Sequence, residues 1–232
     1  MRNVILLVLM MVLPCVAGAA GSGHYSIIKK YDGVTSINYD KEVKPKQWYL
    51  NAHADLSLLN WKNEYTYGAE TGTDKFNFKP VYGLDLALGC KFNKTWRGDV
   101  EFDYVGRYSE TETEYYSDYY TEKTDFNLSI MALTVNGYYD FKSGVYMGLG
   151  AGAAVIKASL NHSALKDVSK TNASPMGAVM LGWSRPVNDK LSFDMRYRFA
   201  TFTGSKFDDL DVQIKIGLIM DNSLSVGLRY AF

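Results

Sequence analysis

Apolar and polar side chains alternate along most of the chain, the pattern of a β-strand with two unlike faces. From Trp48 to Leu58 every even position is apolar, whereas the odd positions carry Tyr, Asn, His, Asp and Ser. Apolar or small residues also occupy most even positions from Phe76 to Phe92 and from Trp96 to Tyr108. The alternation predicts an all-β chain built from long strands.

Later segments repeat the alternation with other phases. The apolar positions are odd from Leu191 to Phe199 and even from Leu224 to Phe232. Between Asp125 and Tyr139 they change from even to odd after Ile130, which predicts a β-bulge near that residue. The segment from Met176 to Trp183 is apolar on both faces, so the pattern does not define its phase.

Short and long connections alternate between these segments, as periplasmic turns and external loops do in outer-membrane barrels. The short ones lie at 93–95, 142–144 and 186–190, and the long polar ones at 63–75, 109–124 and 159–174. They delimit strands near 47–60, 76–92, 96–108, 124–140, 145–158, 174–185 and 190–203, followed by one long final strand that ends at Phe232. Eight is an even number, which returns the C-terminus to the side where the first strand begins.

The apolar face distinguishes a membrane barrel from a soluble β-sandwich, which also alternates. Large aromatic residues gather on this face at strand ends: Trp48, Phe92, Trp96, Trp183, Tyr230 and Phe232. Aromatic girdles at the two headgroup levels are typical of transmembrane barrels. We therefore predict an eight-stranded antiparallel up-and-down transmembrane β-barrel over residues 47–232.

The first twenty residues have the layout of a secretory signal peptide, with Arg2, the apolar run Val4–Leu13 and small residues up to Ala20. We expect its removal on export; the apolar run is too short to span a bilayer as a helix. Cys15 would leave with it, and Cys90 alone allows no intramolecular disulfide. Residues 21–46 then form either a periplasmic arm or two further strands of a ten-stranded barrel.

Composition and charge narrow the class of partner. Lys plus Arg and Asp plus Glu number 25 each, so there is no basic field of the kind that neutralises nucleic-acid phosphates. The 18 tyrosines indicate a protein at an interface between an apolar and an aqueous environment, because their rings are apolar and their hydroxyls polar. We expect no nucleic-acid partner.

The polar face of the strands is expected to fill the barrel lumen. Eight strands enclose a space just wide enough for side chains, and unpaired charge there would be costly. We predict an internal charge network of His53, Asp55, Asp85, Arg97, Asp99, Glu101, Asp103, Arg107, Asp194, Arg196, Arg198 and Arg229. Gly148, Gly150 and Gly152 recur within one strand, where they either make room for bulky lumen neighbours or let strands approach. Such filling disfavours an open pore, although a narrow porin-like channel for small solutes is one alternative.

Candidate chemistry is sparse in this sequence. His162 precedes Ser163, but adjacent side chains of an extended chain point apart, and no third orienting acid is evident. His24 falls in the N-terminal region and His53 in the lumen set, so no histidine or cysteine cluster has metal-ligand spacing. We expect no catalytic residue, metal or cofactor; a lipid-modifying enzyme is the less favoured alternative.

The second long connection is the best candidate for surface contact. Residues 109–125 carry six carboxylates against Lys123. Four tyrosines also cluster there: Tyr115, Tyr116, Tyr119 and Tyr120. Tyrosine supplies rigid contact area at low entropic cost, which favours contact with a host cell or matrix surface. The alternative is a solvated β-extension.

Three segments resemble one known family: VMLGWSRPVNDKLSFDMRYRFATF (Val179–Phe202), GVYMGLGAGAAV (Gly144–Val155) and the closing SVGLRYAF. They look like the bacterial opacity-type outer-membrane β-barrel domain, often labelled porin-like, from about Trp48 onward. The resemblance implies a surface antigen, adhesin or structural barrel without catalytic residues, set in the lipid of a Gram-negative outer membrane. Residues 24–46 depart from the pattern, because barrels of this family usually start soon after the signal peptide.

The C-terminus carries the most specific part of this resemblance. Leu228, Tyr230 and Phe232 are similar to the signal that the barrel assembly machinery reads. The resemblance therefore implies that machinery as a partner.

Overall fold

The structure is a computed structural model that describes residues 47–232 except 68–69, 118–119, 163–167, 204–205 and 210–211. Its strands are β1 (Gln47–Tyr67), β2 (Glu70–Lys91), β3 (Trp96–Ser117), β4 (Tyr120–Asp140), β5 (Val145–His162), β6 (Val168–Pro186), β7 (Leu191–Phe202), β8 (Lys206–Asp209), β9 (Val212–Ile216) and β10 (Ile219–Ala231). Within these residues, no helix is long and apolar enough to cross a membrane.

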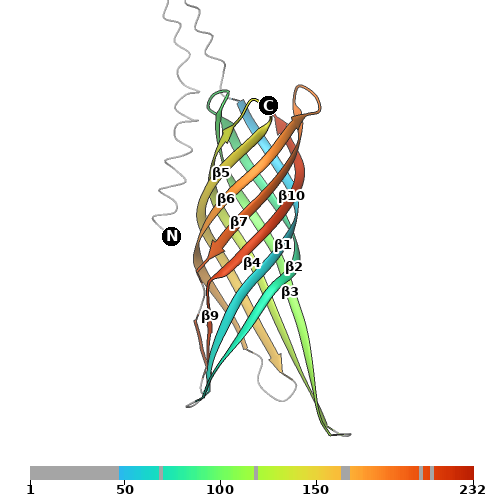
Figure 1. The fold of residues 1–232 in the computed structure, drawn as a ribbon, viewed down its shortest axis with the longest axis vertical. Helices are drawn as coiled ribbons and strands as arrows, with labels where there is room; N and C mark the ends of the chain where they lie inside the picture. The colour runs from blue at the N-terminus through green and yellow to red at the C-terminus, as the bar shows by residue number, and fades with distance from the viewer. Residues whose placement is uncertain (1–46, 68–69, 118–119, 163–167, 204–205, 210–211) are drawn as a thin grey trace, which may run out of the picture.

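Eight of these strands form a closed antiparallel barrel, as predicted (Figure 1). Strands β1 to β7 pair in chain order, β10 pairs with β7, and β10 closes the ring on β1. The closing register runs from Tyr49 opposite Ala231 to Asn60 opposite Met220. The ring is complete without residues 21–46; these and the expected signal peptide lie outside the described residues.

The alternation places one face of each strand inside and the other outside. In β1 the odd positions from Tyr49 to Leu59 are buried, whereas Leu50 and Leu56 are exposed on the outer surface.

Three short turns join strand pairs at the end of the barrel that also holds the C-terminus (Figure 1). Asparagines stabilise two of them: Asn93 Oδ1 accepts from Trp96 N at 2.8 Å, and Asn188 Oδ1 accepts from Leu191 N at 2.8 Å. We call this the turn end.

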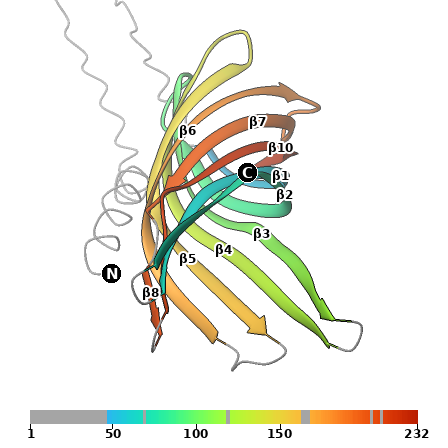
Figure 2. The same cartoon turned by 60° about the horizontal axis from the view of Figure 1, so that its bottom comes forward.

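The opposite end carries strands that run beyond the ring, and we call it the hairpin end. Pairing of β1 with β2 continues to Tyr67 opposite Glu70, and pairing of β3 with β4 continues to Ser117 opposite Tyr120. The predicted long loops at 63–75 and 109–124 are therefore largely β-hairpins. Figure 2 shows the β1–β2 and β3–β4 hairpins diverging from each other.

The bulge predicted in residues 125–139 lies in the neighbouring strand instead. Even positions of β4 face inward from Leu128 to Tyr138 without a change of phase. The register shift falls between Tyr104 and Gly106 of β3. The hydrophobic pattern changes in β4 because its inward positions are apolar up to Ala132 and mostly polar beyond it.

The predicted single final strand is interrupted. The pairing breaks at Gly217, whose N–H donates to Lys62 O at 2.7 Å, and β10 begins at Ile219. Before this break, β9 pairs with β8 and also with Asn63–Tyr67 of β1. The short β8–β9 hairpin thus extends the wall next to β1 at the hairpin end.

Candidate functional site

The half of the lumen toward the turn end is filled by paired charges. Arg196 donates Nη2 to Asp85 Oδ2 at 2.5 Å and Nη1 to Glu101 Oε2 at 2.6 Å. Arg198 reaches Glu101 Oε1 at 3.3 Å and also pairs with Asp103. These side chains come from three strands, β2, β3 and β7, and all are buried. We call this network the polar zone.

His53 connects two carboxylates of the polar zone. Its Nδ1 lies 2.7 Å from Asp85 Oδ1, and its Nε2 lies 3.0 Å from Asp194 Oδ1. Asp194 also pairs with Arg229 and accepts from the Tyr146 hydroxyl at 2.6 Å. His53 therefore occupies a hydrogen-bonded position between β2 and β7 rather than an open one.

Arg97 is held mainly by aromatic rings. Its guanidinium carbon lies 3.9 Å from the ring centroid of Tyr138 and 4.4 Å from that of Tyr146, and Nε donates to Asp140 at 2.9 Å. Cation–π contact is strongest where both groups are removed from water. Tyr138 needs space on the neighbouring strand β5, where a Cβ at Gly148 would lie 2.5 Å from its ring. This agrees with the predicted role of the Gly148 series.

All members of the predicted charge network are buried except Arg107. Arg107 is exposed, and its Nη2 donates to Asn127 Oδ1 at 2.8 Å. The prediction for Arg107 is wrong because the bulge between Tyr104 and Gly106 reverses the faces of β3 beyond it.

Several buried polar residues of the lumen escaped prediction. Asn136 donates Nδ2 to Asp99 Oδ1 at 2.9 Å, and Arg198 Nη2 lies 3.7 Å from Asp221 Oδ2. Asp221 lies within the predicted final strand but was not included in the predicted charge network. It shares the odd phase of Arg229, which could have identified it as inward-facing.

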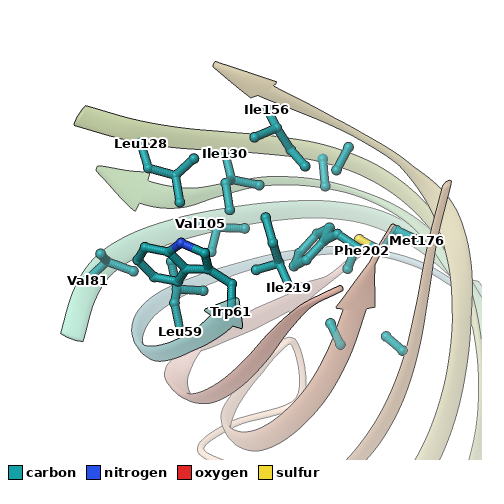
Figure 3. Close-up of a cluster of buried hydrophobic side chains, with 14 of the residues drawn as sticks. Leu59, Trp61, Val81, Val105, Leu128, Ile130, Ile156, Met176, Phe202 and Ile219 are labelled. Atoms are coloured by element: carbon teal, nitrogen blue, oxygen red, sulfur yellow. The ribbon is translucent and has the colours of Figure 1, made fainter. Parts of the chain in front are cut away.

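The half of the lumen toward the hairpin end is apolar, and we call it the apolar zone. Figure 3 shows side chains from most of the barrel strands meeting there: Leu59, Trp61, Val81, Val105, Leu128, Ile130, Ile156, Met176, Phe202 and Ile219. None of these is more than 5% exposed. The predicted charge network does not extend into this half of the lumen, and the apolar zone was not predicted. The sequence does contain a sign of this zone, because the inward positions of β1 change from polar Ser57 to apolar Leu59 and Trp61.

A possible metal-ligand group lies in the polar zone. One donor atom each from His53, Asp85 and Glu101 lie within 4.8 Å of one another. Arg196 already bridges the two carboxylates, and His53 is shared with Asp194. A metal ion would have to displace this guanidinium, so the donor set fits a salt-bridge network better than a metal centre.

Three of the four candidate contact tyrosines lie in the strands near the end of the β3–β4 hairpin. Tyr115 and Tyr116 belong to β3, Tyr120 begins β4, and Tyr119 lies outside the described residues. Glu114 is opposite Glu122 in this register, so the tip is acidic on both strands. Closer to the barrel, Thr111 Oγ1 donates to Asp125 Oδ1 at 2.6 Å across the hairpin.

The remaining candidate residues lie apart from the lumen. His162 ends β5, and Ser163 and His24 lie outside the described residues. Leu228 and Tyr230 are 50% and 45% exposed on the outer face of β10, and Phe232 is 62% exposed. The rings of Tyr230 and Phe232 stack with centroids 6.4 Å apart. The C-terminal motif is thus presented on the barrel exterior.

Comparison with known sequences finds no matching family model and no matching curated protein. Solved structures do resemble the chain. The outer membrane protein OprG from Pseudomonas aeruginosa superposes with a TM-score of 0.50 at 11% identity, over 81% of this chain and 95% of OprG. Neisserial surface protein A gives a TM-score of 0.45 at 18% identity, over 80% of this chain and 97% of its own. The attachment invasion locus protein of Yersinia pestis gives 0.42 at 17%, over 78% and 98%.

Identities this low bear on the fold alone, and the superposition on OprG carries that argument. The closed antiparallel ring of this chain agrees with its superposition on OprG. The chain therefore has the fold of the bacterial outer-membrane β-barrels.

Proposed function

We propose that the protein is an outer-membrane surface protein whose barrel anchors extended hairpins that contact a host cell or matrix. The barrel exterior supports the membrane location. Leu84, Leu86 and Leu88 are 50% to 61% exposed along one face of β2, and Trp96 at the turn end is 52% exposed. A continuous apolar surface with aromatic residues at its rim fits hydrocarbon between two headgroup layers. In this orientation the turn end faces the periplasm.

The β3–β4 hairpin is the observation that carries the contact role. Backbone pairing continues from Gly106 opposite Ile130 to Ser117 opposite Tyr120, beyond the last pairing of β3 with β2. A paired hairpin holds its tip in place better than a flexible loop, which lowers the entropic cost of binding. Tyr115, Tyr116, Tyr119 and Tyr120 would then be presented to the outside as aromatic contacts. Outer-membrane lipid and the barrel assembly machinery, through Leu228, Tyr230 and Phe232, are the other proposed partners.

Replacing the four tip tyrosines with serine tests the contact role. Binding of cells that display the protein to host cells or immobilised matrix should fall at least about tenfold, since about 1.4 kcal/mol of lost contact gives that factor. The matched control is Tyr65→Ser with Tyr67→Ser on the β1–β2 hairpin. Unboiled gel mobility reports the folded barrel in every variant. Equal binding by the tip variant and wild type would refute the proposal.

The filled lumen disfavours the channel alternative. Purified protein in a planar bilayer should give no stepwise conductance, because charge pairs and then apolar side chains occupy the described barrel interior. We also propose that the protein is not an enzyme and uses no cofactor or metal. An altered outer-membrane lipid profile after His162→Ala or Ser163→Ala would contradict the proposal that the protein is not an enzyme.

A further inference from the structure

Positive charge gathers in the three turns of the turn end. Turns 92–95, 141–144 and 187–190, together with the adjoining end of β6, carry one exposed acid, Asp189, and four exposed cations: Lys94, Lys142, Arg185 and Lys190. None of the four cationic side chains has an ion pair or hydrogen bond with another described residue. We call these four cations the basic collar. The hairpin end has the opposite character, since residues 109–125 carry six carboxylates against Lys123.

The collar follows the rim of the barrel because backbone hydrogen bonds join its turns to their neighbours. Asp140 N donates to Thr95 O at 2.7 Å, between the second turn and the first. Ser184 N donates to Gly144 O at 2.8 Å, which holds the second turn against β6 just before Arg185. Gly144 adopts φ +86°, a backbone conformation that favours glycine. The second turn and the Arg185 end of β6 are therefore neighbours.

Outward-facing aromatic rings lie directly on the barrel side of the collar. Leu181 and Trp183 are 55% and 37% exposed on the outer face of β6, and Arg185, two residues further, continues this row. The rings of Tyr139 and Phe141 pack edge to face with centroids 5.0 Å apart immediately before the second turn. Aromatic residues of transmembrane barrels mark the level of the lipid headgroups. The collar thus lies where hydrocarbon gives way to headgroups.

We infer that the basic collar binds an anionic phospholipid of the leaflet at the turn end, with its phosphate at Lys142 and Arg185 and an acyl chain along Trp183. A guanidinium donates two parallel hydrogen bonds to a phosphate, and an ammonium adds a compact positive charge. The position directly beyond lipid-facing side chains favours a membrane lipid over an anion free in solution. This inference rests on the proposed membrane location but not on the contact role of the tip tyrosines.

Quenching of Trp183 fluorescence by brominated lipids tests the inference. The full chain carries Trp48, Trp61 and Trp96 replaced by Phe, so that Trp183 is the only tryptophan. It is reconstituted in phosphatidylcholine vesicles that contain a minor fraction of phosphatidylglycerol. Bromine is carried either by the phosphatidylglycerol or by an equal amount of the phosphatidylcholine. We expect phosphatidylglycerol to be enriched about fivefold beside Trp183, the factor that corresponds to about 1 kcal/mol of attraction.

Removal of the two central cations should abolish this enrichment. The variant is Lys142→Gln with Arg185→Gln, which changes only exposed side chains. Salt at about 1 M should reduce the enrichment in the protein with an intact collar, because the Debye length then falls to about 3 Å. The matched control is Arg107→Gln with Lys157→Gln, which removes two exposed cations toward the hairpin end. Its enrichment beside Trp183 should equal that of the protein with an intact collar.

The outcomes separate this inference from the membrane location on which it rests. Unboiled gel mobility verifies the folded barrel in every variant. Equal quenching by the two brominated lipids, or enrichment that survives Lys142→Gln with Arg185→Gln, would overturn the inference and leave the membrane location intact. Absence of quenching by either lipid would contradict the membrane location, and the inference would fall with it.

Discussion

Replacement of Arg196 by methionine measures how far the lumen excludes water. The change removes the cation that bonds Asp85 at 2.5 Å and Glu101 at 2.6 Å while keeping most of the side-chain volume. Removing one partner of a buried ion pair typically costs about 3–5 kcal/mol, because the other charge is left unpaired. We expect the free energy of unfolding to fall by at least about 3 kcal/mol. Urea titration in detergent micelles, followed by tryptophan fluorescence and unboiled gel mobility, measures it.

Two companion variants make the Arg196 result specific. Arg107→Met removes the same charge from an exposed position, and its effect should stay within about 0.5 kcal/mol. Adding Glu101→Gln to Arg196→Met restores the charge balance and should recover part of the lost stability, because Asp85 keeps His53 and Arg198 keeps Asp103. If Arg196→Met alone lowers the unfolding free energy by less than about 1 kcal/mol, the carboxylates are hydrated and the argument for a closed lumen fails.

Three further substitutions test the two faces of the wall by urea titration. Gly182→Ala should destabilise by about 1–3 kcal/mol through overpacking, because its Cβ would lie 2.2 Å from the Tyr146 ring; Gly177→Ala on the same strand meets nothing within 4 Å and should be nearly neutral. Leu86→Arg places a charge on the outward apolar face of β2 and should cost about 2–4 kcal/mol in lipid vesicles. No loss from Leu86→Arg would contradict burial of this face in hydrocarbon.

Strand alternation predicted the fold because it depends on local sequence alone. The phase from Trp48 to Leu58 defines an inner and an outer face of β1, and the short turns fix which strands are neighbours. When every strand pairs with its sequence neighbours and turns its polar face inward, a closed antiparallel barrel is the simplest arrangement. The inward residues of β2 and β7, such as Asp85 and Arg196, follow directly from the same phase.

The errors arise where a strand changes face or the lumen changes polarity. The bulge beside Gly106 moved Arg107 outward, and nothing in the local pattern distinguishes that glycine from others in strands. The change near Ile130 was interpreted as a bulge because the lumen was assumed polar throughout; an apolar inner face produces the same pattern. The pairing of β2 with β3 ends at Leu84 and Tyr104, and alternation within either strand alone does not show where pairing between two strands stops.

The bonds of the polar zone join residues that are remote along the chain, and this bears on assembly. His53 meets Asp194 across 141 positions, and Arg196 meets Asp85 across 111. A nascent barrel that lacks its seventh strand contains both acids of the Arg196 bridge but not their cation. We therefore expect chains truncated before β7 to close poorly and to be more susceptible to proteolysis than the complete ring.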